Sequence, residues 1–201
     1  MPKVKVPRKS TSVDMTAMTD VAFLLLTFFM LATQFKPEEP VTINAPSSVA
    51  EVPLPDKDMM TITISDDSRV FFELQGQQYK ETLIKKVAAL HSITFTPEQI
   101  KSFSLMSSFG VPLNQLGNLL NTKSEERAQF PQKGIPCDSL NNELAEWIWQ
   151  SRLTNNQVRV AIKGDQEANF PVVKQVIKTL QDKKVNRFNF ITNMSTETVE
   201  K

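Results

Sequence analysis

Residues 15–35 read MTAMTDVAFLLLTFFMLATQF, and this stretch decides the architecture of the chain. It is 21 residues long, and Asp20 is its only ionisable side chain. A helix rises about 1.5 Å per residue, so this one spans roughly 30 Å, the thickness of the hydrocarbon core of a bilayer. The stretch therefore predicts a single transmembrane helix over residues 15–35.

An acidic side chain is unfavourable inside such a helix. A carboxylate at the helix centre costs roughly 2.5–3.5 kcal/mol, and somewhat less nearer the end. A helix that served only as an anchor would be more stable without Asp20. We therefore interpret Asp20 as a functional group that carries a proton or another small cation.

Other polar side chains share the helix face of Asp20. At about 100° per residue, Thr16, Thr27 and Gln34 all fall within about 40° of Asp20. A polar stripe of this kind is expected on a face that lines a wet path or packs against other membrane helices. Thr19 lies off the stripe, and we expect its hydroxyl to bond back to its own helix.

Two simpler interpretations of the stretch stay open. The uninterrupted apolar run, residues 21–32, follows a basic segment, as in a cleaved signal peptide. Against this, Asp20 stands at the start of the run, and no clear small-x-small cleavage site precedes Lys36. In the second interpretation the helix is a passive signal-anchor whose Asp20 lies at the membrane interface.

The composition argues against several classes of protein. The chain has 201 residues and a net charge of +1, which suits one domain with an anchor and linkers and shows no nucleic-acid footprint. Cys137 is the only cysteine and His91 the only histidine, so an internal disulfide is excluded and most zinc sites are too. The five glycines form no phosphate-binding loop. We predict no metal, no cofactor, no nucleic-acid partner and no enzymatic activity.

The segments that flank the helix predict its orientation. Residues 1–14 form a basic tail with four Lys or Arg side chains and one acid. The positive-inside rule places this tail in the cytoplasm, beside anionic lipid headgroups, and the rest of the chain across the membrane. Residues 36–58 contain five prolines and predict an extended linker.

One part of the linker has the composition of a docking strand. It includes Val41, Ile43, Asn44 and Pro46. Because Val and Ile favour extended chain, we expect this segment to add to a sheet edge of its own domain or of a partner.

Residues 59–192 predict a folded α+β domain, followed by a tail at residues 193–201. Apolar and polar side chains alternate from residue 59, as in a strand with one buried face, and residues 76–80 predict a turn or a third short strand. Thr96 and Gln99 predict a capping box at a helix start, and Asp138 predicts a further helix cap. The expected strands are 59–65, 69–73, 158–164 and 185–192, and the expected helices are 82–90, 96–109, 111–121, 139–153 and 171–184.

Three stretches resemble the ExbD/TolR family of biopolymer-transport proteins. Residues 14–31 resemble the membrane motif of the family, although Ala17 stands where the family usually has proline. VTINAP, residues 41–46, resembles its post-membrane strand, and residues 160–180 resemble a late strand, turn and helix. The positions that match are Thr16, Asp20, Val21, Phe29, Met30, Lys163, Asp165 and Phe170.

The resemblance covers residues 11–74 and 135–192 and implies the fold class. This class is a single N-terminal transmembrane helix plus an extracytoplasmic α+β domain of ββ…αβαβ order. Residues 75–134 have no counterpart in the motifs, and we interpret them as an insertion in that domain.

The resemblance also implies a function. Family members sit as a pair inside a ring of ExbB/TolQ-like subunits in the bacterial inner membrane, and their acid, here Asp20, carries protons. The work passes through the linker to a TonB-like or Pal-like envelope protein that serves outer-membrane transport. Two alternatives stay open: a membrane-anchored periplasmic binding module, for example for peptidoglycan, and an exported enzyme that uses acids such as Asp66, Asp165 and Glu167.

Overall fold

One helix, α1 (Met15–Ala32), is the element described in the N-terminal unit of the chain, residues 1–37. The computed structural model describes residues 15–32, 40, 43–45, 47–48, 58–138, 141–191 and 193–194. The second unit comprises residues 38–201.

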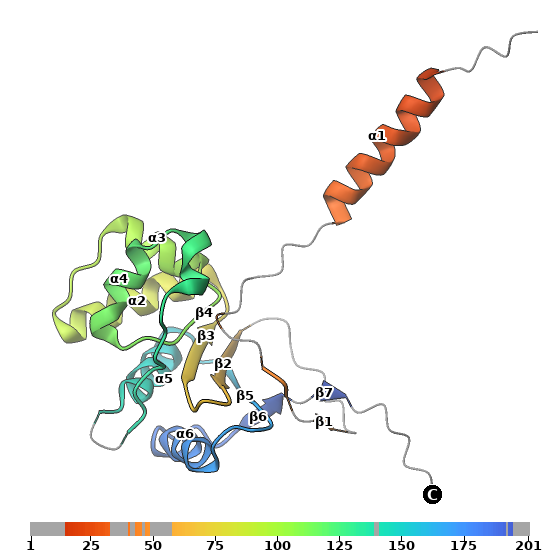
Figure 1. Ribbon diagram of the computed structural model, residues 1–201. Coiled ribbons are helices and arrows are strands. Elements are labelled where there is room, and N and C mark those ends of the chain that lie inside the picture. The colour runs from red at the N-terminus through yellow and green to blue at the C-terminus, as the bar shows by residue number, and fades with distance from the viewer. Residues whose placement is uncertain are drawn as a thin grey trace, which may run out of the picture. The chain divides into compact units, whose positions relative to one another are not determined.

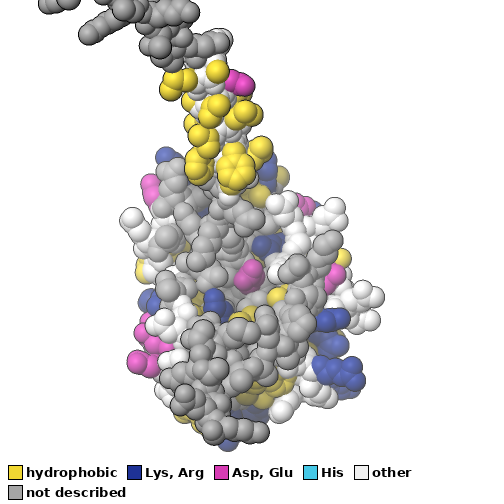
Figure 2. All heavy atoms as spheres, turned by 90° about the vertical axis from the view of Figure 1, so that its right-hand side faces the viewer, with side chains coloured by type: hydrophobic (Ala, Val, Ile, Leu, Met, Phe, Trp, Pro, Cys, Tyr) yellow, Lys and Arg dark blue, Asp and Glu magenta, His cyan; other side chains and the backbone are white. Residues whose placement is uncertain are grey.

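The helix α1 has the length and surface of a membrane span. Its 18 residues correspond to about 27 Å of helix, and none of them is buried. Figure 2 shows apolar side chains over the part of this helix that faces the viewer. Among the described residues, no other helix is long and apolar enough to cross a bilayer. Residues 33–35 of the predicted span lie outside the described residues.

The second unit is built on a five-stranded mixed sheet of strand order β4-β3-β2-β5-β6 (Figure 1). β2 pairs antiparallel with β3 and parallel with β5, and β5 pairs parallel with β6. A separate parallel pair joins β1 to β7. The elements are β1 (Ser47–Ser48), β2 (Met59–Ile64), β3 (Val70–Leu74), α2 (Gln77–His91), α3 (Pro97–Leu105), β4 (Ser108–Phe109), α4 (Leu113–Asn121), the 3-10 helix η1 (Ser124–Gln129), α5 (Glu143–Thr154), β5 (Arg159–Gly164), α6 (Phe170–Asp182), β6 (Phe188–Ile191) and β7 (Asn193–Met194).

Alternation along β2 separates the two faces of the sheet. Met60, Ile62 and Ile64 are fully buried, and they join one hydrophobic core with residues of the helices that lie on that side (Figure 1). Thr61 and Thr63 point to the opposite face, because successive side chains of a strand alternate. The hairpin β2–β3 and the later order α5–β5–α6–β6 agree with the predicted ββ…αβαβ arrangement.

The expected turn or third strand at residues 76–80 is wrong. Gly76 adopts a φ of 91° as the N-cap, and α2 begins at the next residue. The strand that flanks β3 on its outer side is instead β4, which comes about 30 residues later in the chain. The helix predicted over residues 96–109 is therefore wrong at its end: α3 stops at Leu105, and Ser108 and Phe109 form β4, which is too short to show a strand pattern of its own.

Of the two predicted helix caps, the structure confirms one and contradicts the other. The capping box of α3 is confirmed, since the Thr96 hydroxyl accepts from the Gln99 amide and the Gln99 side chain accepts from the Thr96 amide. The cap predicted at Asp138 is wrong. Asn142 caps α5 instead, and its side-chain oxygen accepts from the Ala145 amide at 3.0 Å.

The predicted insertion, residues 75–134, packs into the core of the domain. Its Phe103 and Phe109 meet Phe72 of β3 and Trp147 of α5 in one aromatic cluster. The ring centroids of Phe109 and Trp147 lie 4.9 Å apart, and those of Phe103 and Trp147 lie 6.0 Å apart. The segment is therefore part of the domain and not a separate module.

Gly110 offers a test of this packing. A methyl group added to Gly110 would lie 2.3 Å from Cδ1 of Phe71, whose side chain is buried. Gly110→Ala is expected to lower the free energy of unfolding by about 1–3 kcal/mol, the usual range for overpacking a core. Urea denaturation of the full chain in detergent, followed by tryptophan fluorescence, measures the change.

Gly117 provides the matched control. It lies inside α4, and an added methyl group would meet no atom within 4 Å. Gly117→Ala should raise the free energy of unfolding by about 0.5–1 kcal/mol, because alanine favours a helix interior over glycine. Equal effects of the two variants would contradict the described packing of Phe71 on Gly110.

Candidate functional site

The residues proposed for ion transport lie on α1. Its helical geometry places Thr16, Asp20 and Thr27 on one face. Asp20 is exposed, and among the described residues its carboxylate forms no hydrogen bond and no ion pair. Gln34 lies outside the described residues, so the full length of the predicted stripe stays a prediction.

Two threonine hydroxyls of α1, those of Thr19 and Thr27, are oriented by their own helix. The Thr19 hydroxyl donates to the Met15 carbonyl at 2.7 Å, as the sequence predicted. The Thr27 hydroxyl, on the face of Asp20, donates to the Leu24 carbonyl at 2.9 Å. Its lone pairs stay directed outward, where they are able to accept a hydrogen bond from water or from a neighbouring helix.

The linker docks onto the loop between β5 and α6. The Asn44 amide donates to the Asp165 carboxylate at 2.9 Å, and the Gln166 amide donates to the Asn44 carbonyl at 3.0 Å. Ala45 is buried at this contact. Residues 43–45 form no strand. The contact is to a loop, so the sheet-edge pairing that was expected is not seen for them, and Val41 and Pro46 lie outside the described residues.

Asp165 organises this contact with both carboxylate oxygens. While Oδ2 accepts from the Asn44 amide, Oδ1 accepts from the Glu167 amide at 3.0 Å and forms a tight turn. The Asp165 amide itself donates to the Ile64 carbonyl at the end of β2. The carboxylate therefore ties the linker to the sheet. The family motif predicts Asp165 in a turn, and its bond to the linker is not predicted from sequence.

A second contact ties the linker to the C-terminal end of the domain. β1 pairs in parallel with β7, with Ser47 opposite Asn193 and Ser48 opposite Met194. The predicted tail, residues 193–201, thus begins with a paired segment. Residues 195–201 lie outside the described residues.

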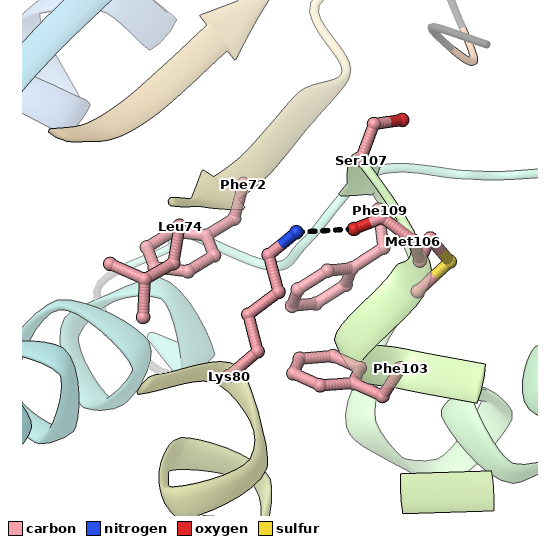
Figure 3. Close-up of a pocket in the computed structure, with 7 residues that line it drawn as sticks. All are labelled: Phe72, Leu74, Lys80, Phe103, Met106, Ser107 and Phe109. Atoms are coloured by element: carbon pink, nitrogen blue, oxygen red, sulfur yellow. Dashed lines mark hydrogen bonds between the residues drawn. The ribbon is translucent and has the colours of Figure 1, made fainter. Parts of the chain in front are cut away.

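A half-buried lysine links α2 to the end of α3 (Figure 3). Lys80 donates to the carbonyl of Met106, the C-cap of α3, and its side chain runs past the rings of Phe103 and Phe109. Burial lowers the pKa of Lys80, and the negative charge of Glu73 partly opposes this shift. Its cation is placed to stabilise the C-terminal carbonyls of α3. Because the sequence predicts a turn or a short strand at residues 76–80, this role of Lys80 is not predicted from it.

The polar groove beside the predicted insertion shows no metal-binding arrangement. It lies between the end of α2 and the start of α5, where His91 pairs with Glu146, and it is lined on the α4 side by Asn114. The carboxylate of Glu143 accepts from the Leu113 amide at 2.7 Å. Within the described residues, no group of three or more His, Cys, Asp or Glu side chains is placed to hold a metal ion.

The Asp165 contact predicts a local effect on the linker. In Asp165→Asn, the side-chain oxygen should keep its hydrogen bond from the Glu167 amide, because asparagine forms this kind of turn readily. The side-chain NH₂ group would then face the Asn44 amide, and two donors cannot form a hydrogen bond. We expect hydrogen exchange of the Asn44 amide to accelerate about tenfold, the loss of one charge-assisted hydrogen bond. NMR on the full chain in detergent measures this rate.

Asp66→Asn is the matched control, because it removes the same charge from another turn. The Asp66 carboxylate accepts from the Asp67 amide at 2.8 Å, in the turn between β2 and β3. Exchange at Asn44 should be unchanged in this variant. Equal acceleration in both variants would show that net charge, and not the Asp165 contact, holds the linker.

The lowered pKa of Lys80 predicts a dependence of stability on pH. Between this pKa and the ordinary value of 10.5, the unfolded chain binds a proton that the folded chain has released. The free energy of unfolding should therefore rise with pH in this window, relative to Lys80→Met, which cannot titrate. Urea denaturation of both proteins between about pH 7 and about pH 10 tests this, and parallel curves would contradict it.

Comparison with known proteins gives one match. A family model described as Biopolymer transport protein ExbD/TolR matches residues 7–195. This range includes α1 with Asp20, the docked linker and Asp165, and it runs through residues 75–134, whose status as an insertion stays a prediction. Searches of curated proteins and of solved structures find no match. Because the matched range is nearly the whole sequence, this chain belongs to the ExbD/TolR family of biopolymer transport proteins.

Proposed function

We propose that this chain is the ion-coupling subunit of a membrane motor that drives transport across the outer membrane. The family consists of inner-membrane, transport-associated proteins without enzymatic activity, which gives the general class. The observation that carries the specific proposal is Asp20, the one ionisable side chain on the apolar helix α1. Among the described residues, nothing neutralises its charge.

Protonation of Asp20 would act as the switch. A charged carboxylate is unfavourable in hydrocarbon, and a protonated one is much less so. Protonation and deprotonation of Asp20 would therefore change where α1 is most stable relative to the helices and lipid around it. The membrane potential supplies about 2.3 kcal/mol per charge per 100 mV, to which any pH gradient adds.

The proposed assembly supplies the partner helices that a single membrane helix needs to form an ion path. A lone helix cannot enclose a path for ions, so Asp20 needs partner helices, and an ExbB/TolQ-like ring around a pair of these chains would provide them. The polar face of Thr16, Asp20 and Thr27 would line the ion path. With its N-terminus in the cytoplasm, the chain would place residues 38–201 in the periplasm, where a TonB-like or Pal-like protein receives the work.

Asp20→Asn tests the proposal. The amide has the shape of the acid but cannot carry a proton, so energised uptake in cells should fall at least about tenfold, as for loss of an essential proton carrier. Membrane insertion and co-purification with the ring subunits should stay at the native level. Uptake of a labelled substrate measures the first, and membrane pull-downs measure the second.

Thr19→Val is the control on the same helix. Thr19 lies off the face of Asp20, and its hydroxyl serves only its own backbone as far as the described residues show. Uptake should stay close to native in this variant. Native uptake in Asp20→Asn would instead favour a tethered periplasmic binding module, and a mature N-terminus beyond Phe35 would favour a cleaved leader.

A further inference from the structure

Three exposed apolar side chains lie on two neighbouring helices, α2 and α5. Leu90 of α2 is 59% exposed, and Trp149 and Leu153 of α5 are 43% and 56% exposed. None of them belongs to the hydrophobic core of the domain. A single exposed leucine is ordinary, but leucine and tryptophan side chains that are exposed together indicate a contact surface. We call these three residues the α2–α5 patch.

Two contacts between α2 and α5 place the members of the patch beside one another. The helices pack together on one side of the sheet (Figure 1). Lys86 Nζ donates to the Leu153 carbonyl at 3.1 Å, and His91 at the end of α2 pairs with Glu146 near the start of α5. The two helices are therefore antiparallel. Leu153 lies at the first contact and Leu90 directly before the second, while the tryptophan lies between the two contacts on α5, so the patch extends over roughly 11 Å, about two helical turns.

Basic side chains border the patch. Lys85 is exposed on α2, and Arg152 of α5 donates to the carbonyl of Lys184 at 3.2 Å, which brings this exposed lysine to the same end of α5. Glu146 also borders the patch, but its carboxylate pairs with His91. Among the described side chains that these contacts place beside the patch, the charges without an ion-pair partner are therefore positive.

An anionic bilayer surface suits both properties of this face. Tryptophan and leucine side chains favour the boundary between headgroups and acyl chains, and lysine and arginine are attracted to anionic headgroups. A small soluble anion would neutralise the cations but would leave the exposed apolar side chains in water. The outer sides of two helices that lie together form an extended face, which a bilayer covers without a recessed groove.

The covalent chain keeps the domain close to a bilayer. α1 has the length and composition of a membrane span, and Asp165 of the domain holds the Asn44 amide. Asn44 comes 12 residues after Ala32, the end of α1, so even a fully extended chain between them spans only about 40 Å. A folded domain of this size is itself roughly 35–40 Å across, so its faces lie within reach of the membrane surface. Because tethering raises the effective concentration of the bilayer, even a weak contact of this face would be populated.

We propose that the α2–α5 patch and its bordering cations dock the folded domain on the anionic surface of the bilayer that α1 spans. The apolar side chains of the patch enter the boundary between headgroups and acyl chains, and Lys85 and Arg152 contact the headgroups. The proposal requires α1 to anchor the chain, but it makes no use of Asp20. Docking is therefore measured separately from ion coupling, and either proposal can fail without the other.

The test uses the full chain in nanodiscs of phosphatidylglycerol with brominated acyl chains, at one chain per disc, so that a second copy cannot cover the patch. The chain has two tryptophans: Trp147 is buried in the core, and Trp149 belongs to the patch. Bromine quenches tryptophans that approach the acyl chains, so the native protein should lose fluorescence. Trp149→Phe keeps only the buried tryptophan, and its quenching should be at least about threefold smaller. Quenching that is equal in the two proteins would overturn the proposal.

Two further changes separate the apolar and the charged parts of the contact. Leu153→Ser should reduce the quenching of Trp149 about threefold, because it removes apolar area from the contact and leaves the core intact. Brominated phosphatidylcholine should quench less than the anionic lipid, because its headgroup does not attract Lys85 and Arg152. Equal quenching in the two lipids would overturn the choice of an anionic surface.

Leu105→Trp in the Trp149→Phe background is the matched control. Leu105 is 62% exposed on α3 and lies outside the patch, so this tryptophan is tethered to the disc by the same chain. It should stay as weakly quenched as Trp149→Phe alone. Equal quenching at positions 105 and 149 would overturn the proposal in favour of a domain that contacts the bilayer at random. A Trp149 that is shielded from acrylamide but not quenched by bromine would overturn it in favour of a protein partner.

Discussion

The contact of three phenylalanine rings with Trp147 is the interaction on which the folded domain depends. Phe72 comes from the hairpin, Trp147 from the helix before β5, and Phe103 and Phe109 from the segment between them. Aromatic pairs contribute about 0.5–1.5 kcal/mol beyond the area that they bury. Because the rings come from four elements, the cluster fixes α3 and α5 against the sheet, and the intervening segment folds as part of the same core.

Much of the fold could be predicted because its elements carry local patterns. The alternation in β2, the periodicity of α6 and the capping box of α3 each depend on residues close in sequence. The start of α2 depends on the positive φ of Gly76. Sequence does not predict this helix start, because a glycine is equally compatible with a turn. β4 is two residues long and exists only because β3 has a free edge beside it, a non-local condition.

The functional residues also divide into those that local sequence predicts and those that depend on remote contacts. Asp20 was identified from sequence because an acid within an apolar stretch is unusual by itself. The roles of Asp165 and Lys80 depend on partners that are remote in sequence: the Asn44 amide, 121 residues away, and the Met106 carbonyl, 26 residues away. A turn motif predicts that Asp165 caps its own loop, and it gives no information about which other segment uses the second oxygen.

The linker contact and the proposed ion movement are of comparable energy. Two hydrogen bonds hold Asn44 at the β5–α6 loop, one of them to a carboxylate, and together they are worth about 2–4 kcal/mol. One charge that crosses 100 mV releases about 2.3 kcal/mol, so the proposed ion movement and the release of the linker are of similar magnitude. Under the proposed function, a much stronger contact would keep the linker bound throughout, and a much weaker one would transmit no force. Since Asp165 also bonds to the end of β2, the docked linker is connected to the central strand of the sheet.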